Sequence, residues 1–234
     1  MSAAVYDRIG RGYASYRRPD PRIAARIEVA LGDARRVVNV GAGTGSYEPN
    51  GAVAVEPSRT MIGQRVTTNV AVQAVAEALP FADDAFDVAL AVITVHHWPN
   101  LAAGLAELRR VAPRQVIVTF DWDIHDAHWI FDYVPEVLSI VVPPIGALGG
   151  TSVEVVELPH DCTDQFLVAP WRRPEVFLDP SARAAMSGLA LIPESVVDDA
   201  MERLASDLRT GAWARRYGHL LARETLDVGL RIVT

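Results

Sequence analysis

The sequence predicts an α/β fold built on a doubly wound, mostly parallel sheet of seven strands. Three observations lead to this fold class. Short runs of β-branched and apolar residues alternate with segments whose apolar residues recur at helical spacing. A glycine-rich turn at 41–45 follows the first such run. The run over 88–95 is almost continuously apolar, which is typical of a strand buried on both faces at the centre of a parallel sheet.

Length and composition narrow the classes of protein that fit. The chain has 234 residues, 50% of them hydrophobic, which predicts one globular domain with elaborations. Its net charge of −7 argues against nucleic acid or an anionic membrane as the main partner. A single cysteine, Cys162, excludes an internal disulfide and a cysteine-rich metal site. Because no signal-like or membrane-spanning run is seen, we expect a cytoplasmic protein, which is a monomer or a homodimer.

The first half of the chain divides into regular elements. An apolar stripe predicts a helix over 21–31 that Gly32 closes. A short helix follows Ser58, and Asn100 is a suitable N-cap for a helix over 101–111. Strands are expected at 37–40, 52–55, 70–74, 88–95 and 115–120. From the first strand onwards the expected order is β-α-β-α-β-β-α-β, which also places a helix between the strands at 37–40 and 52–55.

The second half of the chain is less regular. Ser195 and Asp198 fit a capping box that opens a helix closed by Gly211. The stretch 159–218 is expected to be a mostly helical insertion over the site. The remaining expected elements are a helix over 129–142 and strands over 153–158 and 228–233.

The glycine turn separates two strands, and the second strand ends at an acidic residue, Glu56. Glycines let the backbone turn tightly and approach a ligand, and a carboxylate in this place can accept both hydroxyls of a ribose. The order G-x-G-x-G lacks the third glycine of the dinucleotide fingerprint, and Glu56 lies only 11 residues after Gly45. Because no Lys-Ser or Lys-Thr pair follows, a Walker-type phosphate loop is excluded.

This spacing resembles motif I of the class I S-adenosylmethionine-dependent methyltransferases. The resemblance implies that Gly41, Ala42, Gly43 and Gly45 hold the methionine part of the cofactor, S-adenosylmethionine. A dinucleotide site and a plain strand–turn–strand are the alternatives. The family usually has an acid where Asn39 stands, so a hydrogen-bond acceptor remains there without the charge.

A second stretch, A-E-A-L-P-F-A-D-D-A-F-D-V over 76–88, resembles the loop that contacts adenine in the same family. The resemblance implies that Ala76, Glu77 and Ala78 border the base, partly through backbone N–H groups. Relatives often carry an acid where Val75 stands, so the contact to the adenine amino group is lost or falls to Glu77. The other residues assigned to the cofactor are Pro57, Met61 and Val92. A thioether near adenine can pack on its face or simply fill the core.

The N-terminal segment carries aromatic residues at helical spacing, including Tyr13 and Tyr16, up to Pro19 and Pro21. Its pattern resembles the N-terminal cap of many small-molecule methyltransferases. The resemblance implies that Tyr13 and Arg17 face the carboxylate of the cofactor. An arginine suits this role because its planar fork can hold a carboxylate through two hydrogen bonds. The two interpretations are a lid over the cofactor and a solvated terminal helix.

The central strand runs into T-V-H-H-W-P-N, residues 94–100. Ligands of doubly wound sheets bind at the carboxyl ends of strands, so we expect this turn beside the transferable methyl group. His97 is the candidate general base because imidazole titrates near neutral pH, and a histidine satisfied by backbone bonds is the alternative. The His-Trp pair resembles a subgroup that includes relatives of trans-aconitate methyltransferase. Weaker base candidates are His160, Asp121 and His125. No metal site is expected, because no third ligand has suitable spacing.

These features predict an S-adenosylmethionine-dependent methyltransferase that acts on a small-molecule acceptor. The alternative is a noncatalytic methyltransferase-like protein that binds the cofactor or a ligand in regulation or assembly, which Asn39 and Val75 favour. A nicotinamide enzyme is a third interpretation. The expected division of the single domain, 1–234, is a lid at 1–20, a cofactor-binding core at 21–158, a helical substrate cap at 159–218 and a terminal helix end with the last strand at 219–234.

Overall fold

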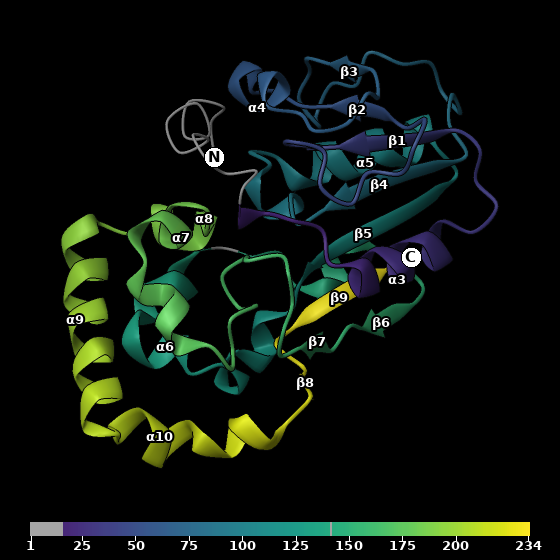
Figure 1. Cartoon of the computed structure of the whole chain (residues 1–234). Coiled ribbons are helices and arrows are strands. Elements are labelled where there is room, and N and C mark those ends of the chain that lie inside the picture. Colours follow the sequence, from purple (N-terminus) through teal and green to yellow (C-terminus); the bar gives the residue numbers. More distant parts are fainter. Residues whose placement is uncertain (1–15, 141) are drawn as a thin grey trace.

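The computed structural model describes residues 16–140 and 142–234, so most of the expected lid, with Tyr13, lies outside the described part. Seven strands form one sheet: β1 (Val37–Val40), β2 (Val53–Val55), β3 (Ala71–Val72), β4 (Val88–Val92), β5 (Arg114–Phe120), β6 (Val153–Val155) and β9 (Leu230–Val233). Their order across the sheet is β3-β2-β1-β4-β5-β9-β6 (Figure 1). All neighbours are parallel except β9, which runs antiparallel to β5 and β6. This is the doubly wound, mostly parallel sheet that the sequence predicts.

Helices cover both faces of the sheet. The buried side of α3 (Pro21–Leu31) joins Leu90 in one apolar cluster. The buried side of α5 (Leu101–Val111) joins Ala89 in a second cluster on the opposite face. Successive residues of β4 therefore serve different faces, as the pleat of a strand requires. Because both faces are covered, the central strands are almost wholly buried, which explains their continuous apolar sequence.

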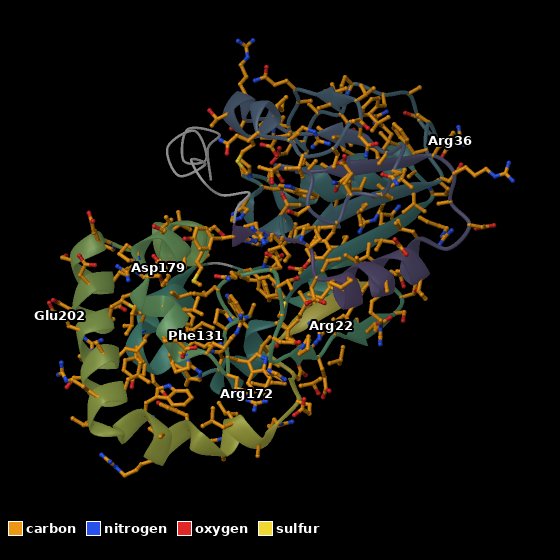
Figure 2. All side chains as sticks on the ribbon, viewed as in Figure 1. Arg22, Arg36, Phe131, Arg172, Asp179 and Glu202 are labelled. Carbon is orange, nitrogen blue, oxygen red and sulfur yellow. The ribbon has the colours of Figure 1, made fainter. Side chains whose placement is uncertain are left out.

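The chain after β5 also builds a helical lobe beside the sheet (Figure 1). The elements outside the sheet from here on are η2 (Trp122–Ala127), α6 (Ile130–Tyr133), η3 (Pro135–Ser139), η4 (Ile145–Leu148), β7 (Leu158–Pro159), η5 (Pro174–Leu178), α7 (Pro180–Ala184), α8 (Ser187–Ala190), α9 (Glu194–Thr210), α10 (Ala212–Tyr217), η6 (Gly218–Ala222) and β8 (Thr225–Leu226). Trp129 lies at the centre of the lobe, with ring centroids 5.3 Å from Phe177 and 5.5 Å from Trp213. Figure 2 shows Phe131 inside the lobe and Glu202 on the outer side of α9.

Several predicted helix boundaries are confirmed. Asn100 caps α5 through its side chain, and Ser58 does the same for α4 (Arg59–Gly63). Gly32 closes α3, and Gly211 closes α9 in the left-handed conformation with φ of +73°. Capping by these polar side chains and glycines depends on local sequence alone, which is why it could be predicted.

The link between β1 and β2 contains no helix, so this part of the expected order is wrong. Five residues of the link have positive φ: Gly41, Gly43, Gly45, Tyr47 and Gly51. Left-handed residues repeated at this density interrupt a right-handed helix. The link therefore remains a series of turns, which keeps the backbone of the glycine turn close to the end of β2.

Four of the predicted strands differ from the structure by more than one residue. The run over 88–95 leaves the strand conformation at Ile93, whose φ is +51°. The last strand begins only after Gly229, whose φ is +93°, rather than at 228. Only two residues of the stretch 70–74 form β3. The segment 153–158 divides between two sheets, because β6 pairs with β9 whereas β7 pairs with β8.

Two helix predictions are corrected. The helix over 129–142 is interrupted at Val134, with φ of −130° and ψ of 70°, and continues only as the 3-10 turn η3. A residue before proline is disfavoured in helical conformation, and Pro135 follows directly. The Ser195–Asp198 capping box is wrong, because α9 already begins behind Pro193. Ser195 thus lies in the first turn of the helix.

We predict that Gly104→Ala destabilises the protein, although alanine favours helices by about 1 kcal/mol over glycine. Gly104 faces Trp98, and a Cβ there would lie 2.4 Å from the indole ring. Overpacking of this kind typically costs about 1–3 kcal/mol. Urea denaturation measures the effect. Gly63→Ala is the matched control, because nothing lies within 4 Å of a Cβ at that position. A rise in stability for both variants would contradict the packing.

We also predict an acid-dependent loss of stability from His128. This imidazole is buried in the lobe, where its Nδ1 accepts a hydrogen bond from the N–H of Ile130 at 3.0 Å. Burial lowers its pKa to about 3 from the ordinary 6.5. Between pH 6.5 and pH 3 the imidazole is therefore protonated in the unfolded chain but neutral in the folded chain. Stability from this group is thus complete above pH 6.5 and falls by about 1.4 kcal/mol per pH unit towards pH 3.

The measurement is urea denaturation between pH 7.5 and 4.5 for the wild type and for His128→Asn, which cannot titrate in this range. The difference in unfolding free energy between the two proteins is expected to shrink as pH falls. Parallel pH profiles would show that the imidazole is protonated in the folded protein.

Candidate active site

A cavity of about 220 Å³ lies beside the carboxyl ends of β1, β2 and β4. This is the edge at which doubly wound sheets bind ligands. Its wall comes from the glycine turn, the end of β2 with the start of α4, residues 74–77, and the turn that follows β4. Two residues far from these segments complete it, Arg17 and Ser187. The cavity therefore lies where the sequence predicts the site.

Glu56 holds the glycine turn against the end of β2. Its Oε2 accepts the N–H of Gly43 at 2.9 Å, and its Oε1 accepts the N–H of Ser58 at 2.9 Å. The carboxylate is 6% exposed and belongs to the cavity wall. A carboxylate offers about four lone-pair sites, so this side chain can accept from hydroxyl donors as well as from N–H groups. Met61, buried at the first turn of α4, lines the same part of the cavity.

Asn39 lines the cavity from β1, and a buried carboxylate stands behind it. The Asn39 side-chain N–H donates to Glu48 at 3.0 Å, while Glu48 also forms an ion pair with Arg65 and accepts from Thr67. Within the described residues, Oδ1 of Asn39 is buried and has no hydrogen-bond partner. A buried amide oxygen of this kind is costly unless a donor reaches it, so it marks a place for a ligand N–H group.

Residues 74–77 form the side of the cavity next to β4. Ala74, Val75, Ala76 and Glu77 line it, whereas Ala78 does not. The carboxylate of Glu77 accepts the N–H of Asn100 at 3.0 Å, which ties this segment to the start of α5. The Glu77 side chain therefore has a structural partner as well as a place in the cavity wall.

The turn after β4 carries strained backbone. Ile93 has φ of +51°, which is an outlier for a β-branched residue. Thr94 follows and packs against Gly41, where a Cβ would lie only 2.0 Å from its Oγ1. Ile93, Thr94, His97 and Trp98 then line the cavity together. Strain of this kind persists only where the surroundings fix it, and it is common at functional sites.

The imidazole of His97 is neutral at physiological pH. Burial lowers its pKa to about 2, and the neighbouring His96 adds to the effect; the pKa of His96 is itself lowered to about 4 by burial. The centroids of the two rings lie 3.8 Å apart, so a proton on one ring disfavours protonation of the other. The expectation that His97 titrates near neutral pH is therefore wrong. His97 does line the cavity.

Arg17 reaches the cavity from the described end of the N-terminal segment. Its guanidinium forms two hydrogen bonds to Asp164, from Nε to Oδ1 at 2.6 Å and from Nη2 to Oδ2 at 3.3 Å. No local sequence pattern predicts this pairing, because the two residues are 147 positions apart. The cation predicted from the resemblance is thus present at the cavity as one half of a buried ion pair.

Most of the predicted site residues meet at this cavity. Those that line it are Arg17, Gly41, Ala42, Gly43, Glu56, Pro57, Met61, Ala76, Glu77, Val92 and His97. Gly45 and Ala78 do not line it. Gly45 instead packs against Thr67, which a Cβ would approach to 2.9 Å. Ser46, Tyr47 and Ser187 line the cavity but were missed. The first two directly follow the glycine turn, whereas no local signal marks Ser187.

The weaker base candidates lie elsewhere. Asp121 is within 3.5 Å of Arg231 and His160 within 3.4 Å of Glu224, and neither lines the cavity. The side chain of His125 lies outside the described part. Among the described residues, no three His, Cys, Asp or Glu side chains are grouped to hold a metal ion. None of the helices in 16–140 and 142–234 has the length and apolar character needed to cross a membrane.

Several known proteins are similar to this chain in architecture and in sequence. A family model described as a methyltransferase domain matches residues 38–119. A crystal structure from Anabaena variabilis, provisionally described as a methyltransferase from an antibiotic biosynthesis pathway, is 31% identical and has a TM-score of 0.86. The match covers 94% of this chain and 99% of that one.

Two curated relatives match over shorter lengths, and both are described as uncharacterized. Protein MJ1252 of Methanocaldococcus jannaschii is 32% identical over 133 residues, 53% of each chain. Protein YafE of Escherichia coli is 46% identical over 39 residues, 17% of this chain and 19% of its own. The present chain thus spans about half of one curated relative and a fifth of the other.

We predict that Gly41→Ala lowers the stability of the protein far more than an ordinary substitution of glycine by alanine. A Cβ at Gly41 would meet Thr94 at 2.0 Å, and φ is +74° there. The backbone strain of about 1–2 kcal/mol and the overpacking of about 1–3 kcal/mol should add to roughly 2–5 kcal/mol. Gly51→Ala is the control, because φ is +82° there but nothing lies within 4 Å. Equal denaturation midpoints for the two variants would show that the Thr94 contact yields easily.

Proposed function

Because this chain belongs to the class I S-adenosylmethionine-dependent methyltransferases, we propose that it transfers a methyl group from S-adenosylmethionine to a small-molecule acceptor. The observation that carries the proposal is the Glu56 carboxylate, which faces the cavity at the end of β2 and is bonded to the glycine turn. A carboxylate in this place suits a ribose diol. The antibiotic-pathway description of the Anabaena relative supports a small-molecule acceptor.

The residues present fit this cofactor. Glu56 would hold the ribose hydroxyls, and the thioether of Met61 would pack near the adenine. The orphaned Oδ1 of Asn39 would accept from the α-amino group, and Arg17 would attract the α-carboxylate. The residues that carry these groups all line the same cavity.

When bound, S-adenosylmethionine supplies an activated methyl group and its own leaving group, a neutral thioether. The tasks of the protein are then to align the acceptor with the methyl group and to exclude water. His97 and Trp98 lie at the end of β4, where the acceptor would approach. We propose that the neutral imidazole orients the acceptor as a hydrogen-bond partner, because the burial that lowers its pKa to about 2 also makes it a weak base.

The noncatalytic alternative differs in one observable. With methyl-labelled S-adenosylmethionine and cell extract, an enzyme transfers the label to a small molecule. A binding protein without catalysis retains the labelled cofactor unchanged. Binding of a reduced nicotinamide cofactor instead, seen as a change in its fluorescence, would overturn the methyltransferase assignment of the cavity.

We predict that Glu56→Gln binds S-adenosylhomocysteine about ten- to a hundredfold more weakly. The substitution keeps the shape of the side chain but removes the charge that strengthens its hydrogen bonds, which are worth about 1.5–3 kcal/mol. Isothermal titration calorimetry measures the affinity, and circular dichroism checks the fold. Glu136→Gln, at an exposed position of η3, is the control. Unchanged affinity in folded Glu56→Gln would refute the ribose assignment.

A further inference from the structure

Two segments far apart in the sequence lie side by side at one wall of the cavity. Arg17 and Asp164 form an antiparallel bridge through their backbones. The N–H of Gln165 donates to the carbonyl of Tyr16 at 3.2 Å, and the hydroxyl of Thr163 to the carbonyl of Pro19 at 3.3 Å. The described end of the N-terminal segment is thus fastened to the segment that follows β7.

The side chains of the bridged residues form a buried ion pair. Arg17 and Asp164 have side-chain exposures of 7% and 0%. The carboxylate accepts from Nε and Nη2, so it fixes the plane of the guanidinium, and Phe166 lies 5.9 Å from Cζ. Two buried charges are stable only when geometry and hydrogen bonding are good, so removing either partner leaves a strongly disfavoured charge.

The two partners differ in their relation to the cavity. Arg17 lines it, whereas Asp164 lies behind and does not. Among the lining residues of the described chain, Arg17 is the one with a permanent positive charge. The Ser46 hydroxyl also donates to the backbone carbonyl of Arg17 at 3.3 Å, which connects the backbone of Arg17 to the residue that follows the glycine turn. The cofactor proposed above ends in an amino-acid group whose carboxylate needs such a cation.

We propose that Asp164 is a positioning residue, which holds the guanidinium of Arg17 in the orientation that receives the α-carboxylate of the cofactor. The inference rests on the proposed function. It assigns a part of cofactor binding to a residue outside the 38–119 methyltransferase match, in the segment that leads into the helical lobe. An ion pair that serves stability alone would not distinguish between ligands with and without the amino-acid group.

The test compares two nucleosides by isothermal titration calorimetry. S-adenosylhomocysteine carries the amino-acid group, and 5′-methylthioadenosine lacks it but keeps the adenosine and the thioether. Asp164→Asn keeps the shape of the side chain and removes its charge, whereas Asp164→Glu keeps the charge and displaces it by one methylene. Asp161→Asn is the matched control, because this carboxylate pairs with Arg22 at 2.7 Å and is 62% exposed.

We expect Arg17→Met to lower the affinity for S-adenosylhomocysteine about ten- to a hundredfold, whereas the affinity for 5′-methylthioadenosine changes less than about twofold. Each Asp164 variant that folds, as judged by circular dichroism, should show the same selective loss at roughly tenfold. Asp161→Asn should leave both affinities unchanged.

Three outcomes would overturn the inference. An unchanged ratio of the two affinities in a folded Asp164 variant would make the pair purely structural. Tighter binding of S-adenosylhomocysteine would show that Asp164 competes with the ligand for Arg17. Failure of both Asp164 variants to fold while Arg17→Met folds and keeps the wild-type ratio would exclude Arg17, and Asp164 with it. If the wild type binds neither nucleoside, the proposed function itself fails.

Discussion

The site depends on how closely the ends of β1 and β4 approach each other. The two strands pair in parallel, so both end at the same edge of the sheet. At that edge Gly41 and Thr94 leave no room for a side chain on residue 41. Only glycine tolerates both the contact and the positive φ, and the backbone of the turn is thereby exposed to the cavity. The carboxylate of Glu56 then fixes the same turn from the side of β2.

The features that the sequence predicts correctly are those that depend on a few neighbouring residues. The glycine turn, the acid at the end of β2 and the N-cap residues Ser58 and Asn100 each act through short-range backbone chemistry. The central strands are equally easy to recognise as apolar runs, because burial on both faces disfavours polar residues. These signals suffice for the fold class and for most of the cavity wall.

The features that could not be predicted depend on distant partners. The chain leaves the strand conformation at Ile93, within a run that is almost continuously apolar, so no residue type marks the change. The division of the 153–158 segment between β6 and β7 follows from pairing with β9 and β8, near the end of the chain. Ser187 reaches the cavity only because the helical lobe packs beside it. None of these positions carries a local pattern that distinguishes it.

Asn39 illustrates how a departure from a motif can be compensated in space. The family usually places an acid at this position, and here the nearby carboxylate belongs to Glu48. That carboxylate is fully buried, yet it is surrounded by donors from Asn39, Arg65, Thr67 and Asn69. A buried charge with this many hydrogen bonds is stable. The amide of Asn39 thus connects the cavity to a negative charge that is absent from position 39 itself.

The neutral histidines have a related physical consequence. The sulfonium of the proposed cofactor is positively charged, so an imidazolium at the end of β4 would repel it at short range. Burial lowers the pKa of His97 and of His96, and their proximity lowers that of His97 further. The turn after β4 therefore presents a hydrogen-bonding ring without a charge. In the same cavity the charge of Arg17 is balanced by Asp164.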